Sequence, residues 1–221
     1  MKNFMVCSSN KQQSIDLFAH QLVIDGIQVK LATSDADMLM VKGTLHEAET
    51  HKTVVVHSVD TDVFIALTHH FNKDTHNRVL METKKGFVSI GDVALKQVKN
   101  EMQECLPVAH VISGCDTVSA TYGLGKLRVY RKLSKSQYWR NQMSIVGDDD
   151  THIEDMIEVG ETFYLELYGK LGEKANSLDN LREMMHSMPK YIPISRMPPT
   201  SRAFHFHMLG THLEVNNYKN L

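Results

Sequence analysis

The chain has 221 residues, more than one small core needs, which suits one domain with a helical extension. Its 42% apolar and 23% charged residues, with 5 prolines and 12 glycines, exclude collagen-like and low-complexity chains. The 24 basic side chains are balanced by 26 acidic ones, so overall positive charge cannot drive binding to nucleic acid. Any such binding must come from a local patch.

The cysteines and the hydropathy pattern indicate the compartment. Cys7, Cys105 and Cys115 show no CxxC or CxC spacing, which argues against a disulfide framework and a structural zinc site. No stretch approaches the roughly 18 uninterrupted apolar residues of a membrane span, and no signal-peptide pattern opens the chain. We therefore expect a soluble intracellular protein with reduced thiols and no membrane partner.

The first third of the chain alternates between helical and strand patterns. Apolar residues recur at helical spacing in two segments, and β-branched or alternating apolar residues form two short runs. The predicted elements are a helix at 9–25, a strand at 27–33, a helix at 38–51, a strand at 53–58 and a helix that begins near 63. From residue 27 onward this order is β-α-β-α, which predicts an α/β fold with a parallel central sheet and flanking helices.

Acidic pairs follow both predicted strands. Asp35 and Asp37 come after the first strand, and Asp60 and Asp62 come after the second. Strands joined by a crossover helix are parallel, so their carboxyl ends share one sheet edge, where ligands of such folds bind. Carboxylates gathered there favour Mg²⁺ or Mn²⁺. Alternatively, each pair only caps a helix, as aspartate commonly does; finding the pair twice favours the metal site.

A fifth acid, Asp116, lies in a glycine-containing segment further along the chain. The residues before it predict a hairpin at 78–90 with its turn at 84–86, a helix at 92–99, and a helix at 107–113 that Gly114 ends. Gly123, Gly125 and Lys126 then form a Gly-x-Gly-Lys turn, in which backbone N–H groups can approach a phosphate closely. The spacing is not that of an ATP-binding loop, so we do not expect ATP to bind.

The segment 126–135 is the local basic patch. It contains five basic residues and no acidic one, and a tyrosine lies among them. Phosphate contacts with aromatic stacking would suit this composition, and a solvated helix face is the alternative. The basic residues are Lys126, Arg128, Arg131, Lys132 and Lys135.

Four of these motifs together resemble the flap endonucleases and XPG-like nucleases of the PIN-like superfamily. They are Ser-Asp-Ala-Asp at 34–37, Val-Asp-Thr-Asp at 59–62, Gly-Cys-Asp at 114–116 and Gly-Leu-Gly-Lys at 123–126, in that family's order and within 27–133. The chain is most similar to uncharacterised, mobile-element-associated animal proteins with DTDV and GCDT motifs. Leu-Pro at 106–107 and Met-Pro-Pro-Thr-Ser at 197–201 are also similar to that group.

The resemblance implies a structure-specific nuclease with one or two Mg²⁺ or Mn²⁺ ions. The implied metal ligands are Asp35, Asp37, Asp60, Asp62 and Asp116. A helix-hairpin segment at 114–133 would grip the backbone of branched or flapped DNA through Gly123, Gly125, Lys126 and Arg128; RNA stays open as a substrate. The resemblance also implies a nuclear location.

The chain departs from this family at its beginning. Family members start with a strand that carries a metal-binding acid, whereas only 26 residues precede the strand predicted at 27–33. An N-terminally short domain is therefore expected, and a catalytically inactive nucleic-acid-binding remnant is one alternative. A phosphotransferase of the HAD type, with an aspartyl-phosphate intermediate, is another, because 53–63 resembles a strand followed by a DxDxV loop.

The predicted domains are a nuclease-type domain at 1–140 and a helical extension at 141–221. The extension contains helical patterns at 153–169 and 177–188 and a proline-containing connector at 189–199. The acids at 148–155 are expected to cap a helix. His205, His207 and His212 have no acidic or thiol companion, so we expect no metal there.

Overall fold

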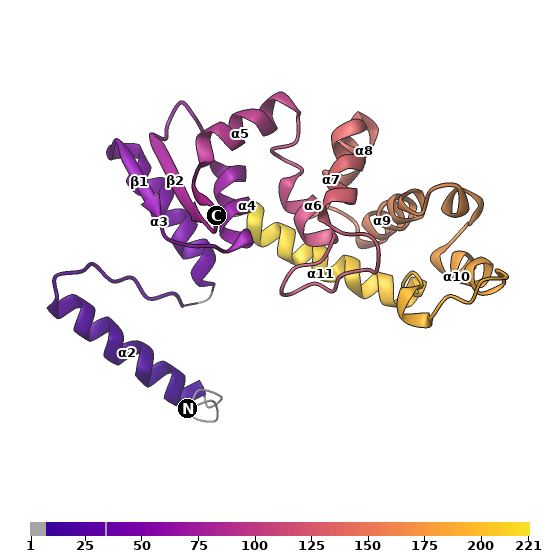
Figure 1. The fold of residues 1–221 in the computed structure, drawn as a ribbon, viewed down its shortest axis with the longest axis horizontal. Helices are drawn as coiled ribbons and strands as arrows, with labels where there is room; N and C mark the ends of the chain where they lie inside the picture. The colour runs from indigo at the N-terminus through magenta and orange to yellow at the C-terminus, as the bar shows by residue number, and fades with distance from the viewer. Residues whose placement is uncertain (1–7, 34) are drawn as a thin grey trace. The chain divides into compact units, whose positions relative to one another are not determined.

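The computed structural model describes residues 8–33 and 35–221, and the chain forms two compact units, residues 1–39 and 40–221 (Figure 1). Cys7 and Ser34 lie outside the described residues. Cys105 and Cys115, the cysteines within them, are both free thiols. No helix in the described part of the chain combines the length and the apolar character needed to cross a membrane.

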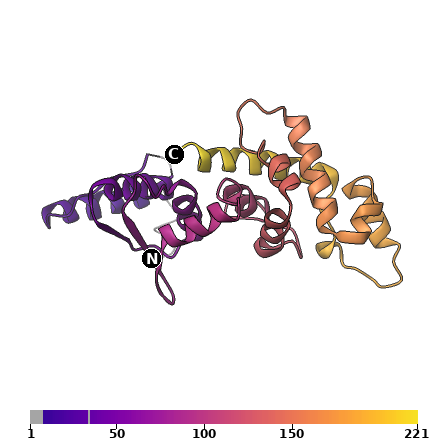
Figure 2. The same ribbon diagram turned by 90° about the horizontal axis from the view of Figure 1, so that it is seen from above.

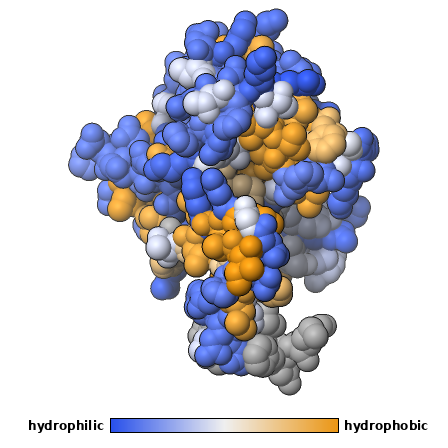
Figure 3. Space-filling model, turned by 90° about the vertical axis from the view of Figure 1, so that its left-hand side faces the viewer, coloured by the Kyte–Doolittle hydropathy of each residue, from blue (hydrophilic) through white to orange (hydrophobic). Residues whose placement is uncertain are grey.

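The first unit contains helix α2 (Ser8–Ile24) and the extended segment that follows it. The helix was predicted, and it ends where Gly26 adopts a φ of +80°. Leu17 and Phe18 are each 73% exposed on α2. Hydrophobic residues are visible in orange on the face shown in Figure 3.

The strand predicted at 27–33 is wrong, because these residues are extended but join no sheet. Ile27 and Leu31, the apolar residues that suggested a buried strand face, are 51% and 53% exposed. An alternating pattern makes a strand only when a neighbouring strand satisfies its backbone groups and covers its apolar side chains.

The second unit contains a mixed sheet of three strands, so the predicted parallel central sheet is correct only in part. Strand β1 (Thr53–Val56) pairs in parallel with β2 (Arg78–Thr83), and β2 pairs antiparallel with β3 (Gly86–Ser89). The hairpin of β2 and β3 was predicted, including its turn, where Gly86 has a φ of +113°. The parallel neighbour of β1 is therefore the next strand along the chain and not the preceding segment.

Helix α5 packs against the sheet, and α4 packs against α5 and α6. Helix α4 (Thr61–His70) is the crossover between the parallel strands, and α5 (Ile90–Lys99) packs against both α4 and β2. Helix α6 (Leu106–Ile112) lies between α4, α7 and α11, and all seven of its residues are buried. The loop that follows α6 is thereby held at the end of a fixed helix.

The remaining helices complete the second unit. They are α3 (Ala36–Thr50), which begins in the first unit, α7 (Lys126–Lys135), α8 (Gln137–Met143), α9 (Ile153–Leu167), the 3₁₀ helix η1 (Gly169–Lys174), α10 (Leu178–His186), the 3₁₀ helix η2 (Ile194–Arg196) and α11 (Ser201–Lys219).

Helix α11 runs back along α9 and α6 (Figures 1 and 2). Near its end, the backbone carbonyl of Tyr218 accepts a hydrogen bond of 2.6 Å from His70 Nε2 on α4. The second unit therefore includes helices from both sides of residue 140, where a domain boundary was predicted. That division of the chain stays a prediction.

Candidate functional site

Asp60 and Asp62 lie where the chain leaves β1 and enters α4. Asp60 is the N-cap of α4, and its Oδ1 accepts a hydrogen bond of 2.9 Å from the backbone N–H of Asp62. The cap has the extended backbone and the side-chain acceptor that a helix start requires. It engages one of the two carboxylate oxygens of Asp60. Asp60 thus caps α4, the cap uses only Oδ1, and the metal site predicted at these residues stays a prediction.

Asp35 and Asp37 repeat this arrangement at the start of α3. The backbone N–H of Asp37 donates to Asp35 Oδ1 over 2.9 Å, and Asp37 lies in the first turn of the helix. Both acids belong to the first unit, whereas the other three predicted metal ligands belong to the second. The convergence of all five carboxylates therefore stays a prediction.

Asp116 follows α6 after a tight turn at Gly114, which has a φ of +102°. The backbone N–H of Cys115 donates to the carbonyl of Val118, and the Cys115 and Thr117 side chains lie 3.3 Å apart (Sγ to Oγ1). This compact loop brings Asp116 to a pocket of about 660 Å³ beyond the carboxyl end of β1. The pocket is lined by Ser58, Val59, Asp60, Thr61, Asp62, His110, Gly114, Cys115, Asp116, Ala120 and Lys126.

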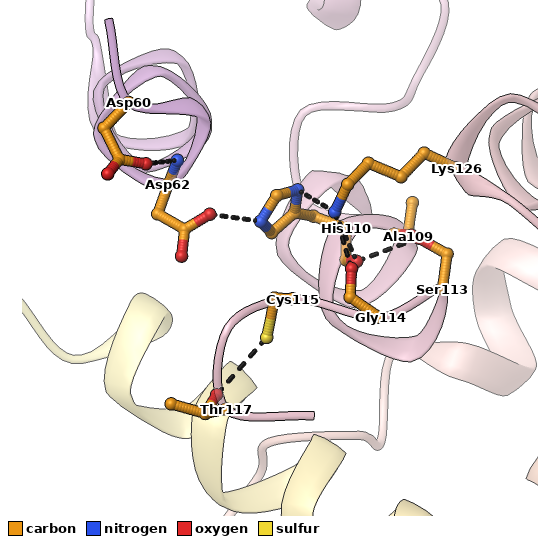
Figure 4. A network of polar contacts seen from close by, with 9 residues as sticks. All are labelled: Asp60, Asp62, Ala109, His110, Ser113, Gly114, Cys115, Thr117 and Lys126. Atoms are coloured by element: carbon orange, nitrogen blue, oxygen red, sulfur yellow. Dashed lines mark hydrogen bonds and ion pairs between the residues drawn. The ribbon is translucent and has the colours of Figure 1, made fainter. Parts of the chain in front are cut away.

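His110 joins the two sides of this pocket (Figure 4). Its Nε2 lies 2.7 Å from Asp62 Oδ1, and its Nδ1 lies 3.0 Å from the Nζ of Lys126. The same ammonium donates to the carbonyl oxygens of His110 and Gly114, over 3.3 and 2.8 Å. Burial lowers the pKa of His110, and so does the charge of Lys126, while Asp62 opposes the shift. Burial also lowers the pKa of Lys126, against the influence of Asp62.

The sequence reasoning missed His110. It is 97% buried within the apolar helix α6, and a single histidine in such a helix is usually a core residue. The only feature of the sequence that indicated a role for His110 was its position one helical turn before the loop that carries Asp116. The partner at 2.7 Å, Asp62, is 48 residues away in the chain.

The predicted phosphate-binding residues form the start of α7. Gly125 is the N-cap of that helix, and Gly123 has a φ of +77°. Arg128 donates to the backbone carbonyls of Gly123 and Leu167, so this guanidinium and the Lys126 ammonium both have partners within the protein. Neither glycine nor Arg128 lines the pocket. The DNA contacts predicted for these residues stay predictions.

Of the other basic residues in the segment 126–135, one forms an ion pair within the protein and two are exposed to solvent. Lys132 forms an ion pair with Glu166, which also accepts a hydrogen bond of 2.8 Å from the indole N–H of Trp139. Trp139 is only 3% exposed and is unavailable for stacking. Arg131 and Lys135 are exposed. The outer face of α7 therefore retains cationic groups that a polyanion can approach.

The pocket contains the type of ligand that a hard divalent cation takes, because three of its lining side chains are carboxylates. Among residues 8–33 and 35–221, no group of three or more His, Cys, Asp or Glu side chains is arranged to hold a metal ion. Mg²⁺ commonly uses only one or two protein carboxylates, with water and substrate phosphate oxygens completing its shell. The chemistry of the pocket thus fits a cation shared between protein, water and phosphate.

Two buried side chains from the C-terminal helices hold the end of α6. The backbone carbonyl of Ile112 accepts hydrogen bonds from the Tyr164 hydroxyl, over 2.7 Å, and from His207 Nε2, over 3.1 Å. Tyr164 lies on α9 and His207 on α11. Because Ile112 precedes Gly114 by two residues, these bonds fix the point from which the Asp116 loop leaves α6.

The burial of His207 against α6 predicts that the stability of the protein depends on pH. Burial lowers the pKa of His207 below its ordinary value of 6.5, although the bond to Ile112 opposes this. As the pH falls below 6.5, His207 of the unfolded chain takes up a proton while the native imidazole stays neutral. The free energy of unfolding should therefore decrease as the pH decreases. Urea denaturation between about pH 8 and pH 5 measures the slope. His207→Gln keeps a donor for Ile112 and should make this slope less steep, because one of the histidines with a lowered pKa is removed; an unchanged slope would assign the effect to the other histidines.

The structure brings Asp60, Asp62, Asp116 and Lys126 together in one pocket and adds His110 to them. Comparisons of the chain with protein-family models, curated proteins and solved structures found no match. The function must therefore be inferred from the chemistry of the pocket itself.

Proposed function

We propose that the protein is a metal-dependent, nuclease-like protein that acts on phosphodiester bonds of DNA at the pocket beyond β1. The observation that carries this proposal is that Asp60, Asp62 and Asp116, from two separate segments, line the same pocket. They lie where a parallel β-α-β unit places its ligand. The resemblance of the sequence motifs supports the same chemistry.

Electrostatics explains why this pocket needs a cation. Three carboxylates face one ammonium, that of Lys126, so an anionic phosphodiester would be repelled from the pocket unless a cation intervened. One or two of the carboxylates of Asp60, Asp62 and Asp116 would hold Mg²⁺ or Mn²⁺, with water and phosphate oxygens completing its shell. When bound, the ion would supply charge neutralisation at the phosphate and activation of water.

The protein's own residues prepare the pocket for this ligand. The cap of α4 fixes the carboxylate of Asp60, and the tight loop after α6 fixes the position of Asp116. At the start of α7, Gly123 and Gly125 would let the DNA backbone approach, with Arg128 and the exposed cations of the helix nearby. Such contacts set the register of DNA without reading bases, which suits a branched or flapped substrate and a nuclear location.

A nucleic-acid-binding protein without catalytic activity is the second candidate. The observation in its favour is that Arg131 and Lys135 are exposed on α7, where they can contact a polyanion without any metal ion in the pocket. Such a protein would bind DNA with a strong dependence on salt concentration but would not cleave it. The phosphotransferase alternative has no further support from the pocket.

The proposed function predicts that Asp60→Asn and Asp62→Asn each abolish Mn²⁺-dependent cleavage of flapped DNA. Asparagine caps a helix as well as aspartate does, so Asp60→Asn removes a charge from the pocket and retains the start of α4. Isothermal titration should show Mn²⁺ binding weakened by more than the roughly 10- to 100-fold that loss of an outer-shell partner typically causes. Circular dichroism and the melting temperature report whether the fold is retained.

The matched control is Asp92→Asn. Asp92 lies in the first turn of α5, as Asp62 does in α4, but it is exposed and lies outside the pocket. Asp92→Asn makes the same change of charge outside the pocket, so the variant should cleave DNA and bind Mn²⁺ as the wild type does. Cleavage that survives both substitutions in the pocket would refute the nuclease, and DNA binding without cleavage by the wild type would establish the second candidate.

A further inference from the structure

The pocket contains a buried imidazole that the proposed chemistry does not use. We propose that His110 is a positioning residue, which holds the carboxylate of Asp62 in the orientation that a divalent cation requires. This inference rests on the proposed function, because it concerns a cation at the same carboxylates. It assigns to α6 a role beyond packing.

The hydrogen-bond partners determine the tautomer of His110. A carboxylate only accepts hydrogen bonds and an ammonium only donates them. Nε2 must therefore carry the proton that it donates to Asp62 over 2.7 Å, and Nδ1 must accept from Lys126 over 3.0 Å. The bond to Asp62 thus has a fixed direction, which the opposite tautomer would lose.

Lys126 is held in place for this role. Its ammonium has three N–H bonds and three protein acceptors, namely Nδ1 of His110 and the carbonyls of His110 and Gly114. A neutral amine would have only two N–H bonds for these three acceptors, so the arrangement suits the charged form. Lys126 therefore fixes the imidazole, and the phosphate contact predicted for it stays a prediction.

Burial makes the imidazole a rigid support. The side chain of His110 is 2% exposed and that of Asp62 is 24% exposed, so a bond from the core reaches a carboxylate at the edge of the pocket. The bond engages Oδ1 of Asp62, and its other oxygen points away from the imidazole (Figure 4). Groups that orient a ligating carboxylate in this way typically affect metal affinity about 10- to 100-fold.

Two substitutions separate the roles of the two ring nitrogens. In His110→Gln the side-chain amide can place its N–H near the position of Nε2, so a donor to Asp62 is retained and the acceptor for Lys126 is lost. In His110→Asn the shorter side chain can place its amide oxygen near Nδ1, so the reverse holds. Each variant keeps one of the two side-chain bonds, and similar melting temperatures are expected.

The test is the Mn²⁺ dissociation constant of the full chain, measured by isothermal titration with MnCl₂ and without DNA. We expect His110→Gln to bind Mn²⁺ as the wild type does and His110→Asn to bind it about 10- to 100-fold more weakly. Equal dissociation constants for the two variants would overturn the inference, because His110 would then be only a structural residue. A wild type that does not bind Mn²⁺ would overturn the proposed function and this inference with it.

A measurement on the wild type covers the case in which a variant does not fold. Long-range ¹H–¹⁵N NMR correlations distinguish the two neutral tautomers of histidine. We expect the His110 signals to be those of the Nε2–H form. The Nδ1–H form would contradict the bond to Asp62 and overturn the inference without any substitution at this position.

Discussion

Gly114→Ala is expected to destabilise the protein by about 2–6 kcal/mol. Gly114 has a φ of +102°, where a residue with a side chain is strained by about 1–3 kcal/mol. A Cβ here would also lie 2.6 Å from the Cα and the Cβ of Ala120, so the Asp116 loop would have to shift. Overpacking of this kind typically costs about 1–3 kcal/mol. The sum is a large fraction of the stability of a typical domain.

The matched control for this substitution is Gly123→Ala. Gly123 also has a positive φ, +77°, but no atom lies within 4 Å of the position that its Cβ would occupy. Thermal unfolding should therefore show a smaller decrease of the melting temperature for Gly123→Ala than for Gly114→Ala. Equal decreases would mean that the loop of Asp116 is not packed against Ala120 as described.

Elements whose signals lie within a few adjacent residues were predicted correctly from the sequence. Gly26 and Gly114 mark the ends of α2 and α6, and the glycine turn at 84–86 marks the hairpin. The local sequence cannot specify which strand is the neighbour of β1, because that depends on packing between distant segments. For this reason the segment 27–33 resembled a strand although it pairs with none.

The same distinction applies to the candidate site. The topology rule placed Asp60 and Asp62 at the carboxyl end of a parallel strand, but it paired that strand with the segment 27–33, whereas β1 is parallel to β2. The bond between Asp62 and His110 joins residues 48 positions apart, and no local pattern specifies it. Lys126 was expected to contact phosphate because it follows two glycines. That contact stays a prediction, while the partners of Lys126 within the chain are acceptors on α6 and in the following loop, which become neighbours only in the folded chain.

Phe163→Ala is expected to lower the free energy of unfolding by about 3–5 kcal/mol, because it removes a large side chain from the hydrophobic core. Phe163 on α9 is fully buried, and its ring contacts Trp139 on α8 edge to face with centroids 5.1 Å apart. Alanine would leave a cavity between these helices, and the cost depends on how far the neighbours collapse into it.

The consequences of Phe163→Ala should reach the site, because the adjacent Tyr164 donates to the carbonyl of Ile112 at the end of α6. Trp139 is the only tryptophan of the chain, so its fluorescence reports on the contact between α8 and α9. Circular dichroism reports on all helices. In urea, both signals should shift together to a lower midpoint, since α8, α9 and α11 belong to the same compact unit as the sheet.

Phe206→Ala is the control, because Phe206 on α11 is 63% exposed and its removal should change stability by less than about 0.5 kcal/mol. Separate transitions for the two signals would instead support a helical extension that unfolds independently of the site.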